Sequence, residues 1–594
     1  EDGSWNRKFI RKANDRNPKL SAEYDYKHEK MLRAFNTLYA EYEIIKNLKF
    51  KTTFSYDYTT VKGEKWYDPR TSNGEDENGE VVKRIREYKK MVWSNTLSYL
   101  TTFNNIHHLD FLAGYEIDDT YNDYLSGEAY NFTTPDKHAI SNGMKTVSVG
   151  GSDSRYRLVS YLSRLNYDYK NKYYLGASFR VDGSSRLHRD NRWGTFWSVS
   201  GAWRTIEEEF MQPVKDWLTD LHIRASYGVN GTLPSDYFGY MGLSSISGGY
   251  LEQPGIQMSQ IANPNLKWAT NYNMNIGLDF GFWDRLNFTI EYYTRTTKNL
   301  LMDCPVSMTT GFSSYLMNIG EVKNKGIELT INSTNIKIKD FSWNTTFNLG
   351  HNSNKVVKLD GEQTQIVSGT QIHKVGSSYR TFYVQEFAGI NPETGNPLFY
   401  TNELDENGNY IKEITENSKN AQFIPYKHAE PTVNGGISNS LRYKWLDLNF
   451  LFSYQFGGYS YDTWAQKTEH GGYDSYANIP TYYRDSWKNP GDQTNIEVYM
   501  LGKSSSVSMH KITSSRRIHS TDYFRLKNIT FGITLPKEWT NKINIGNVRF
   551  YASASNLWTW AAYDNYDPEA VSAGSATQTT PPLKTVTFGL NINF

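Results

Sequence analysis

The chain has 594 residues, with 64 lysines and arginines against 63 aspartates and glutamates, and a single cysteine. A net charge near zero excludes the basic surface that nucleic-acid binding requires. One cysteine, Cys304, excludes an intramolecular disulfide and a cysteine-rich metal site.

The start of the chain predicts little regular structure. Residues 1–30 are interpreted as an entry segment or loop, and residues 31–594 as one barrel-like unit. Glu1–Trp5 have neither the basic nor the apolar region of a signal peptide, so we expect a chain that is either processed or cut.

The main strand signal is alternation of apolar and polar residues, which is typical of strands with one apolar face and one polar face. In chain order, the positions on the apolar face are Phe50, Thr52, Phe54, Tyr56 and Tyr58; Leu175, Ala177, Phe179 and Val181; Leu286, Phe288, Ile290 and Tyr292; Leu446, Leu448, Phe450, Phe452, Tyr454 and Phe456; and Val586, Phe588, Leu590, Ile592 and Phe594. We count roughly sixteen to eighteen such strands, with boundaries uncertain by about 2 to 4 residues.

The composition favours a membrane barrel over a soluble β-protein. No stretch approaches the ~18 consecutive apolar residues of a membrane helix, and the mean hydropathy is −0.66. A transmembrane β-barrel exposes only every second strand residue to lipid, so a negative mean hydropathy is compatible with it. Tyrosines, 45 in all, tend to end the alternating runs, where an amphipathic ring suits a membrane interface. The sequence predicts an all-β, transmembrane antiparallel barrel.

Connections of two lengths support the same fold. Short turns alternate with long polar segments, which we place at residues 60–87, 119–154, 231–268, 353–372, 391–433 and 458–518. Outer-membrane barrels have short turns at one end and long loops at the other.

The candidate catalytic and metal-binding motifs lack the residue spacing that their chemistry requires. His28-Glu29 begins a zinc-protease motif, but Leu32 stands where the second histidine is needed. The acidic segments 73–80 and 405–409 offer oxygen ligands without EF-hand spacing, and we interpret them as hairpin tips. We expect no enzymatic activity, no cofactor and no metal.

Several local phrases together resemble one family. They are Arg180–Arg186 (RVDGSSR), Trp193–Ser200 (WGTFWSVS), Asn263–Trp268 (NPNLKW), Gly320–Gly326 (GEVKNKG), Tyr523–Ile529 (YFRLKNI) and Tyr566–Glu569 (YDPE). In this order, the phrases resemble the SusC/RagA-type TonB-dependent outer-membrane transporters from about residue 20 to Phe594.

The resemblance implies a 22-stranded barrel that is plugged by an N-terminal domain, energised by TonB and covered by a SusD-like surface lipoprotein. The plug, the TonB box and the first strands have no counterpart in this sequence. The resemblance therefore implies the C-terminal part of such a barrel, with energy coupling located in the missing part.

One segment, residues 461–487, predicts a recognition surface because aromatic rings interleave with polar residues. Its rings are Tyr461, Trp464, Tyr473, Tyr476, Tyr482, Tyr483 and Trp487. Contact with the lipoprotein, contact with the substrate and packing within the loop remain open for them. Trp66 and Tyr67, in an earlier segment, leave the same alternatives.

The predicted function is TonB-dependent import of an oligomeric nutrient, an oligosaccharide or a peptide, across the bacterial outer membrane, in contact with its lipid. A passive porin and a secreted carbohydrate-binding β-protein are the alternatives. A TonB box upstream would separate an energised transporter from a porin, and solubility without detergent would identify the secreted protein.

Overall fold

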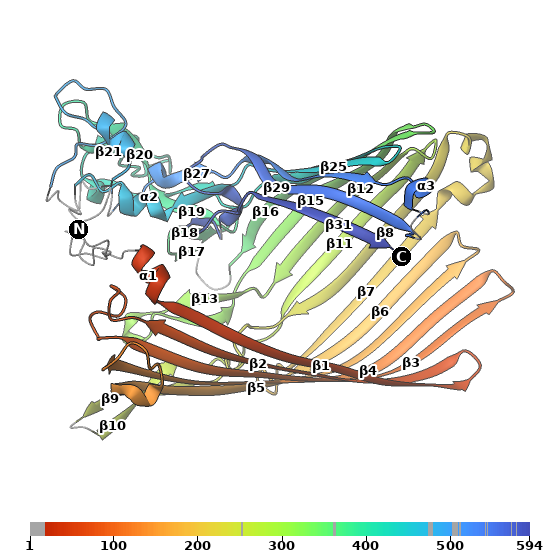
Figure 1. Cartoon of the computed structure of the whole chain (residues 1–594), viewed down its shortest axis with the longest axis horizontal. Helices are drawn as coiled ribbons and strands as arrows, with labels where there is room; N and C mark the ends of the chain where they lie inside the picture. The colour runs from red at the N-terminus through yellow and green to blue at the C-terminus, as the bar shows by residue number, and fades with distance from the viewer. Residues whose placement is uncertain are drawn as a thin grey trace.

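A curved antiparallel sheet of 17 strands forms the wall of the molecule (Figure 1). The computed structural model describes residues 18–250, 253–359, 364–472, 479–501, 509, 512–540, 542, 545–571, 573–577 and 579–593. The wall strands are β1 (Tyr26–Ile45), β2 (Leu48–Tyr67), β3 (Glu80–Phe103), β4 (His107–Phe132), β5 (Gly143–Tyr169), β6 (Tyr173–Ser184), β7 (Trp193–Arg204), β8 (Leu218–Thr232), β11 (Ala269–Phe282), β12 (Leu286–Lys298), β15 (Glu321–Lys337), β16 (Phe341–Lys358), β24 (Val433–Tyr443), β25 (Leu446–Phe456), β28 (Tyr523–Thr534), β29 (Asn547–Ala561) and β31 (Thr585–Asn593).

Strand order in the wall follows chain order. Each wall strand pairs antiparallel with the next one along the chain, from β1–β2 through to β29–β31. The predicted all-β barrel-type fold is confirmed, and 17 strands fall within the predicted number. Among the described strands, β1 and β31 each have a wall neighbour on one side only.

The register assigns the two faces of the sheet. Phe288 lies opposite Phe280 on β11 and Ile331 on β15, and the two phenyl rings stack 4.9 Å apart. On the other face of the sheet, Arg224 of β8 donates to Asp279 of β11 at 2.8 Å. We call the face with the ion pairs the inner face and the apolar one the outer face.

The outer face remains exposed. Phe588 of β31 is 81% exposed, and the other predicted apolar runs lie on the outer face as well. A soluble protein rarely leaves so large an apolar surface open to water, whereas a bilayer covers it.

Short and long connections lie at opposite ends of the wall (Figure 1). At one end, turns of two or three residues join neighbouring strands, for example residues 46–47, 104–106 and 170–172. At the other end, the connections are long and carry the accessory elements. The chain enters β1 from the long-connection end through α1 (Pro18–Tyr24), and β31 runs toward the short-turn end.

Two of the predicted long connections are shorter than expected. The loop placed at residues 60–87 is residues 68–79, and the one placed at residues 119–154 is residues 133–142, because β2 to β5 continue past the apolar band. There the outer face becomes charged: Asp119 accepts hydrogen bonds from Arg155 and Arg157, each at 2.8 Å. Outside the bilayer, the outer face no longer needs apolar residues, so the alternation ends while backbone pairing continues.

The long connections build small sheets and helices above the wall. These are β9 (Leu243–Tyr250) with β10 (Gln253–Gln260); β13 (Leu301–Pro305) with β14 (Ser314–Asn318); β17 (Gln365–Ser368), β18 (Gln371–Lys374), β19 (Thr381–Gln385) and β23 (Phe423–His428); β20 (Phe387–Ile390), β21 (Pro397–Tyr400) and β22 (Ile414–Thr415); and β26 (Tyr459–Asp462), β27 (Ile518–Ser520) and β30 (Ser575–Ala576), with α2 (Thr463–Thr468). At the short-turn end, α3 (Lys537–Thr540) lies between β28 and β29.

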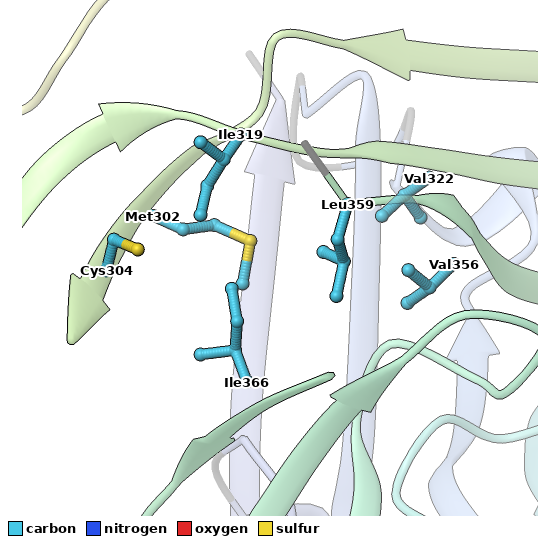
Figure 2. Packing of buried hydrophobic residues seen from close by; sticks show 7 residues of the cluster. All are labelled: Met302, Cys304, Ile319, Val322, Val356, Leu359 and Ile366. Atoms are coloured by element: carbon cyan, nitrogen blue, oxygen red, sulfur yellow. The ribbon is translucent and has the colours of Figure 1, made fainter. Parts of the chain in front are cut away.

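The buried apolar clusters lie mostly at the long-connection end. In the largest, Met302 of β13 packs with Val322 and Val356 of the wall and with Leu359 and Ile366 of the next connection (Figure 2). Cys304 is buried in the same cluster. The β13–β14 hairpin thus folds over the inner side of β15 and β16.

Among the described residues, no helix has the length and hydropathy that crossing a membrane requires. Phe594, predicted as the last outer-face residue, lies outside the described residues.

Candidate functional site

The predicted recognition segment lies in the connection from β25 to β28. Its first strand, β26, pairs antiparallel with β27 and parallel with β30. Asp462 ends β26 and caps α2, because its carboxylate accepts a hydrogen bond from the Ala465 backbone N–H at 2.8 Å. The same carboxylate accepts from the Tyr563 hydroxyl at 3.0 Å, so three separate pieces of chain meet at this point.

The rings of this segment have different environments. Tyr461 is 1% exposed and packs with Phe382, Val384 and Ile518 in one apolar cluster. Trp464, on α2, is 39% exposed. Tyr473 and Tyr476 lie outside the described residues.

The later rings of the segment also contact their own chain. Tyr483 is 4% exposed, and Tyr482 stacks on it with ring centroids 5.7 Å apart. Trp487 donates its indole N–H to the Pro392 carbonyl at 2.7 Å and covers Gly395, where an added Cβ would lie 2.6 Å from the ring. Packing within the loops therefore accounts for most of the described rings, and Trp464 is the most exposed of them.

A buried ion cluster holds this region together. Glu469 accepts hydrogen bonds from Arg517 and from the Tyr482 hydroxyl, and Arg516 lies 3.6 Å from the same carboxylate. Arg517 is fully buried. Burial, and then the hydrogen bond to Glu469, raise the pKa of Tyr482 above its ordinary value, so the phenol stays protonated and donates.

Trp464 borders a cavity of about 630 Å³. Trp464, Trp560 and Tyr566 supply aromatic surface, and the polar lining comes from Asp462, Arg525, Thr559, Asp564, Asn565, Asp567, Thr577 and Thr579. Burial raises the pKa of Tyr566 to about 12. Aromatic surface with a few convergent polar groups is the usual character of a ligand pocket.

An ion network fixes one wall of this cavity. Arg525 of β28 donates to Asp567 at 2.5 Å and also to Glu569. Glu569 accepts further hydrogen bonds from Lys527 at 2.7 Å and from Tyr523 at 3.0 Å. Two phrases that the sequence presents separately, YFRLKNI and YDPE, are therefore partners in space. Their opposite charges were the signal, but the sequence did not show that they meet.

The inner face holds two further cavities. One of about 690 Å³ is lined mainly by amides and hydroxyls from β11, β12, β15 and β16: Asn273, Asn275, Tyr293, Arg295, Thr297, Asn324, Glu328, Asn352 and Asn354. Another, of about 520 Å³, lies toward the short-turn end and includes His108, Asp110, Asn166 and Arg224. Sequence reasoning predicted none of these residues as a site.

Hydrogen bonds within the chain hold both acidic segments in turns. Asp25 accepts from the Asp68 backbone N–H at 2.9 Å and from the Asn73 amide at 2.7 Å, which fixes the turn at residues 68–79. Asp405 accepts from the Asn407 and Asn409 backbone N–H groups in a tight turn. In the described part of the chain, no group of three or more His, Cys, Asp or Glu side chains has the arrangement of a metal site.

Trp66 is buried, with 1% of its surface exposed, in a cluster with Val81, Ala129 and Phe132. Tyr67, next to it, ends β2, and the Lys65 ammonium lies 4.2 Å from its ring centroid.

Residues 2–400 match the family model described as "TonB dependent receptor-like, beta-barrel". This chain belongs to that family. It is therefore an outer-membrane β-barrel of the TonB-dependent receptor type, as the resemblance implied.

Named relatives and solved structures of the TonB-dependent receptor family cover nearly all of this chain. It is 31% identical over 587 residues to TonB-dependent receptor P3 of Formosa agariphila, covering 94% of this chain and 57% of that protein. It is 29% identical over 541 residues to TonB-dependent receptor SusC of Bacteroides thetaiotaomicron, covering 87% of this chain and 51% of that protein. A structure of the RagAB peptide transporter superposes with a TM-score of 0.87 at 26% identity, over 96% of this chain and 63% of that one. The chain thus spans a little over half the length of the curated relatives it matches.

Proposed function

We propose that this chain forms the wall of a TonB-dependent importer that carries an oligomeric nutrient, a glycan or a peptide, across the outer membrane. The polar inner face carries the proposal. The amides around the cavity on β11 to β16 offer donors and acceptors side by side, and so does an oligosaccharide or a peptide backbone. Family membership supports the same role, and one similar solved structure is of a peptide transporter.

Energy coupling and the lid belong to the same proposal. TonB would act through a part of the protein outside this sequence, and a SusD-like lipoprotein would close the long-connection end. Trp464 is the proposed contact residue there, since it is exposed and borders a cavity. Tyr461 and Tyr483 would act by positioning the segment, because both are buried.

A passive porin would share the polar inner face, so energy dependence is the deciding measurement. Uptake of labelled oligosaccharides and oligopeptides is measured in cells that carry the full-length gene, with and without TonB. Loss of uptake without TonB is the expected result, and unchanged uptake would establish the porin. The exposed apolar outer face argues against a secreted soluble protein.

The lid contact has its own test. Trp464→Ala in the full-length transporter should lower its affinity for the lipoprotein about thirtyfold, since loss of an aromatic anchor commonly costs about 2 kcal/mol. Co-purification of the lipoprotein should weaken as a result. Tyr410→Ala, at an exposed ring in another long connection, is the matched control. If Trp464→Ala leaves lipoprotein recovery unchanged but lowers substrate affinity by calorimetry, the ring contacts substrate instead.

A further inference from the structure

Outward-facing lysines cluster on β15 and β16 just above the apolar band. Register places Lys325 between Thr294 of β12 and Ser353 of β16. Two residues higher, Lys323 lies between Thr296 and Lys355. All three lysines are exposed.

The alternation of the strands fixes their direction. Ile327, two residues below Lys325, lies opposite Tyr292, and Leu329 lies opposite Ile290; these are outer-face positions. Residues at even spacing share a face, so Lys325 and Lys323 are on the outer face too. On the inner side at this height, Val322 and Val356 belong to the apolar cluster (Figure 2), and Asn324, between the two lysines of β15, lines the amide-lined cavity.

The height of the lysines follows from the same rows. From Phe282 to Met274, the outer-face residues of β11 are apolar, and Met274 is opposite Thr294. These five outer-face positions are ~6.8 Å apart along the strand, and the strand is tilted by ~40° from the barrel axis. They therefore span roughly 21 to 25 Å along that axis, which is the height of the apolar band of such a barrel. The lysine rows therefore lie at the head-group level, at the long-connection end.

Charge in this patch is unbalanced. Within the described part of the chain, Lys323, Lys325 and Lys355 have no ion-pair partner. The acid nearest in register is Glu321, at the top of β15 and opposite Lys298. Cα atoms in adjacent rows and strands are ~5 to 7 Å apart, so the three lysines leave neighbouring backbone positions on one face, within reach of a single phosphate, with Ser and Thr residues beside them.

We propose that Lys323, Lys325 and Lys355, with Thr294, Thr296 and Ser353, bind the phosphate of a phosphorylated glycolipid head group in the outer leaflet. Ammonium groups and hydroxyls are donors that phosphate oxygens accept. A free phosphate ion has the same chemistry, but the patch lies beside the apolar band, where an acyl-anchored phosphate is held and a soluble ion is not. The lipid would anchor the wall at β12 to β16, directly outside the amide-lined cavity.

The test uses the full-length transporter in neutral detergent, titrated with diphosphoryl lipid A and followed by native mass spectrometry. The variant is Lys323→Gln/Lys325→Gln/Lys355→Gln. Each lysine should contribute about fivefold to the affinity for the lipid, so the triple variant should lose affinity on the order of a hundredfold. The variant with arginine at the same three positions keeps the charge, so its affinity should stay within a few-fold of that of the wild type. This comparison separates the effect of lost charge from misfolding.

Two controls decide the interpretation. Lys337→Gln/Lys339→Gln/Lys444→Gln makes the same change in charge at exposed positions of the short-turn end and should leave affinity unchanged. Dephosphorylated lipid A should bind weakly to every variant, and millimolar inorganic phosphate should not displace the lipid. Equal loss in both triple variants, no loss in the first, or competition by inorganic phosphate would each overturn the proposal.

Discussion

Single side chains of the wall have opposite requirements at adjacent positions. Phe288 faces outward and stacks on Phe280, whereas Asn287 faces inward beside Gly281. The outer position must be compatible with hydrocarbon, and the inner one only with water. Whether a wall residue must be apolar therefore depends on which face its position in the strand gives it.

Phe288→Arg should lower the free energy of unfolding of the full-length barrel in lipid by roughly 1 to 3 kcal/mol, because Phe288 lies in the second of the five apolar rows, between the interface and the midplane, where a charge is most costly. Asn287→Arg, its neighbour on the inner face, should cost much less. Urea titration in lipid vesicles measures both. Equal losses at the two positions would contradict the assignment of the faces.

His519 of β27 should make the small sheet of β26, β27 and β30 sensitive to pH. Its ring stacks on Tyr563 with centroids 3.7 Å apart, and burial lowers the pKa of the imidazole. The ring is neutral when folded, so the unfolded segment binds more protons below about pH 6.5. Stability of this region is full above that pH and falls as the pH decreases toward the lowered pKa.

Hydrogen exchange measures this effect, after correction for intrinsic rates. Protection of residues 518–520 and 563–566 should decrease between pH 7.5 and pH 5.5 in the wild-type transporter. His519→Phe keeps the stack without the titrating group and should remove the pH dependence. The same decrease in both proteins would show that another group is responsible.

Whole elements are positioned by few contacts at the long-connection end. The segment between β29 and β31 is tied to β28 through Arg525, which is buried against Asp567 and Glu569. Removing one member of a buried ion pair leaves the others uncompensated. Arg525 is therefore a main anchor of this connection, beside the β26–β30 pairing and the hydrogen bond from Tyr563 to Asp462.

Arg525→Gln should destabilise the 562–584 connection by about 3 to 5 kcal/mol. Lys527→Gln is the control, since Lys527 also binds Glu569 but is about one-third exposed, and its effect should be within about 1 kcal/mol. Hydrogen exchange over these residues reports the difference, with barrel insertion checked by heat-modified gel mobility. Equal protection in Arg525→Gln and wild type would refute this anchoring role.

Over the whole molecule, strand number decides closure. The described wall has 17 strands, so β1 and β31 run in the same direction and cannot pair antiparallel with each other. An antiparallel barrel closes only if an odd number of further strands stands between them. Open edges in hydrocarbon cost several kcal/mol per unpaired backbone group.

Residues 1–594 expressed alone should therefore aggregate or fail to insert, while the full-length protein inserts. Outer-membrane fractionation and heat-modified gel mobility distinguish the two outcomes. A stable, inserted and importing product from residues 1–594 would show that the wall closes by itself.

The candidate site was less predictable than the wall. Residues 461–487 were predicted as a recognition surface, with packing within the loop left as an alternative. Tyr461 and Tyr483 are buried, and Tyr461 packs with residues distant in sequence, such as Phe382. The pairing of Arg525 with Asp567 joins positions 42 residues apart. No local pattern encodes such contacts.

The sequence by itself determined the wall within the bilayer, because lipid on one side and water on the other impose a two-residue alternation on every strand that crosses. The tertiary structure alone decided how far β2 to β5 extend beyond the bilayer, which rings stay exposed, and which lysines share the outer face at one height. These features depend on register between strands and on loops folding over one another. Water solvates both faces outside the bilayer, so no periodic signal remains there for the sequence to carry.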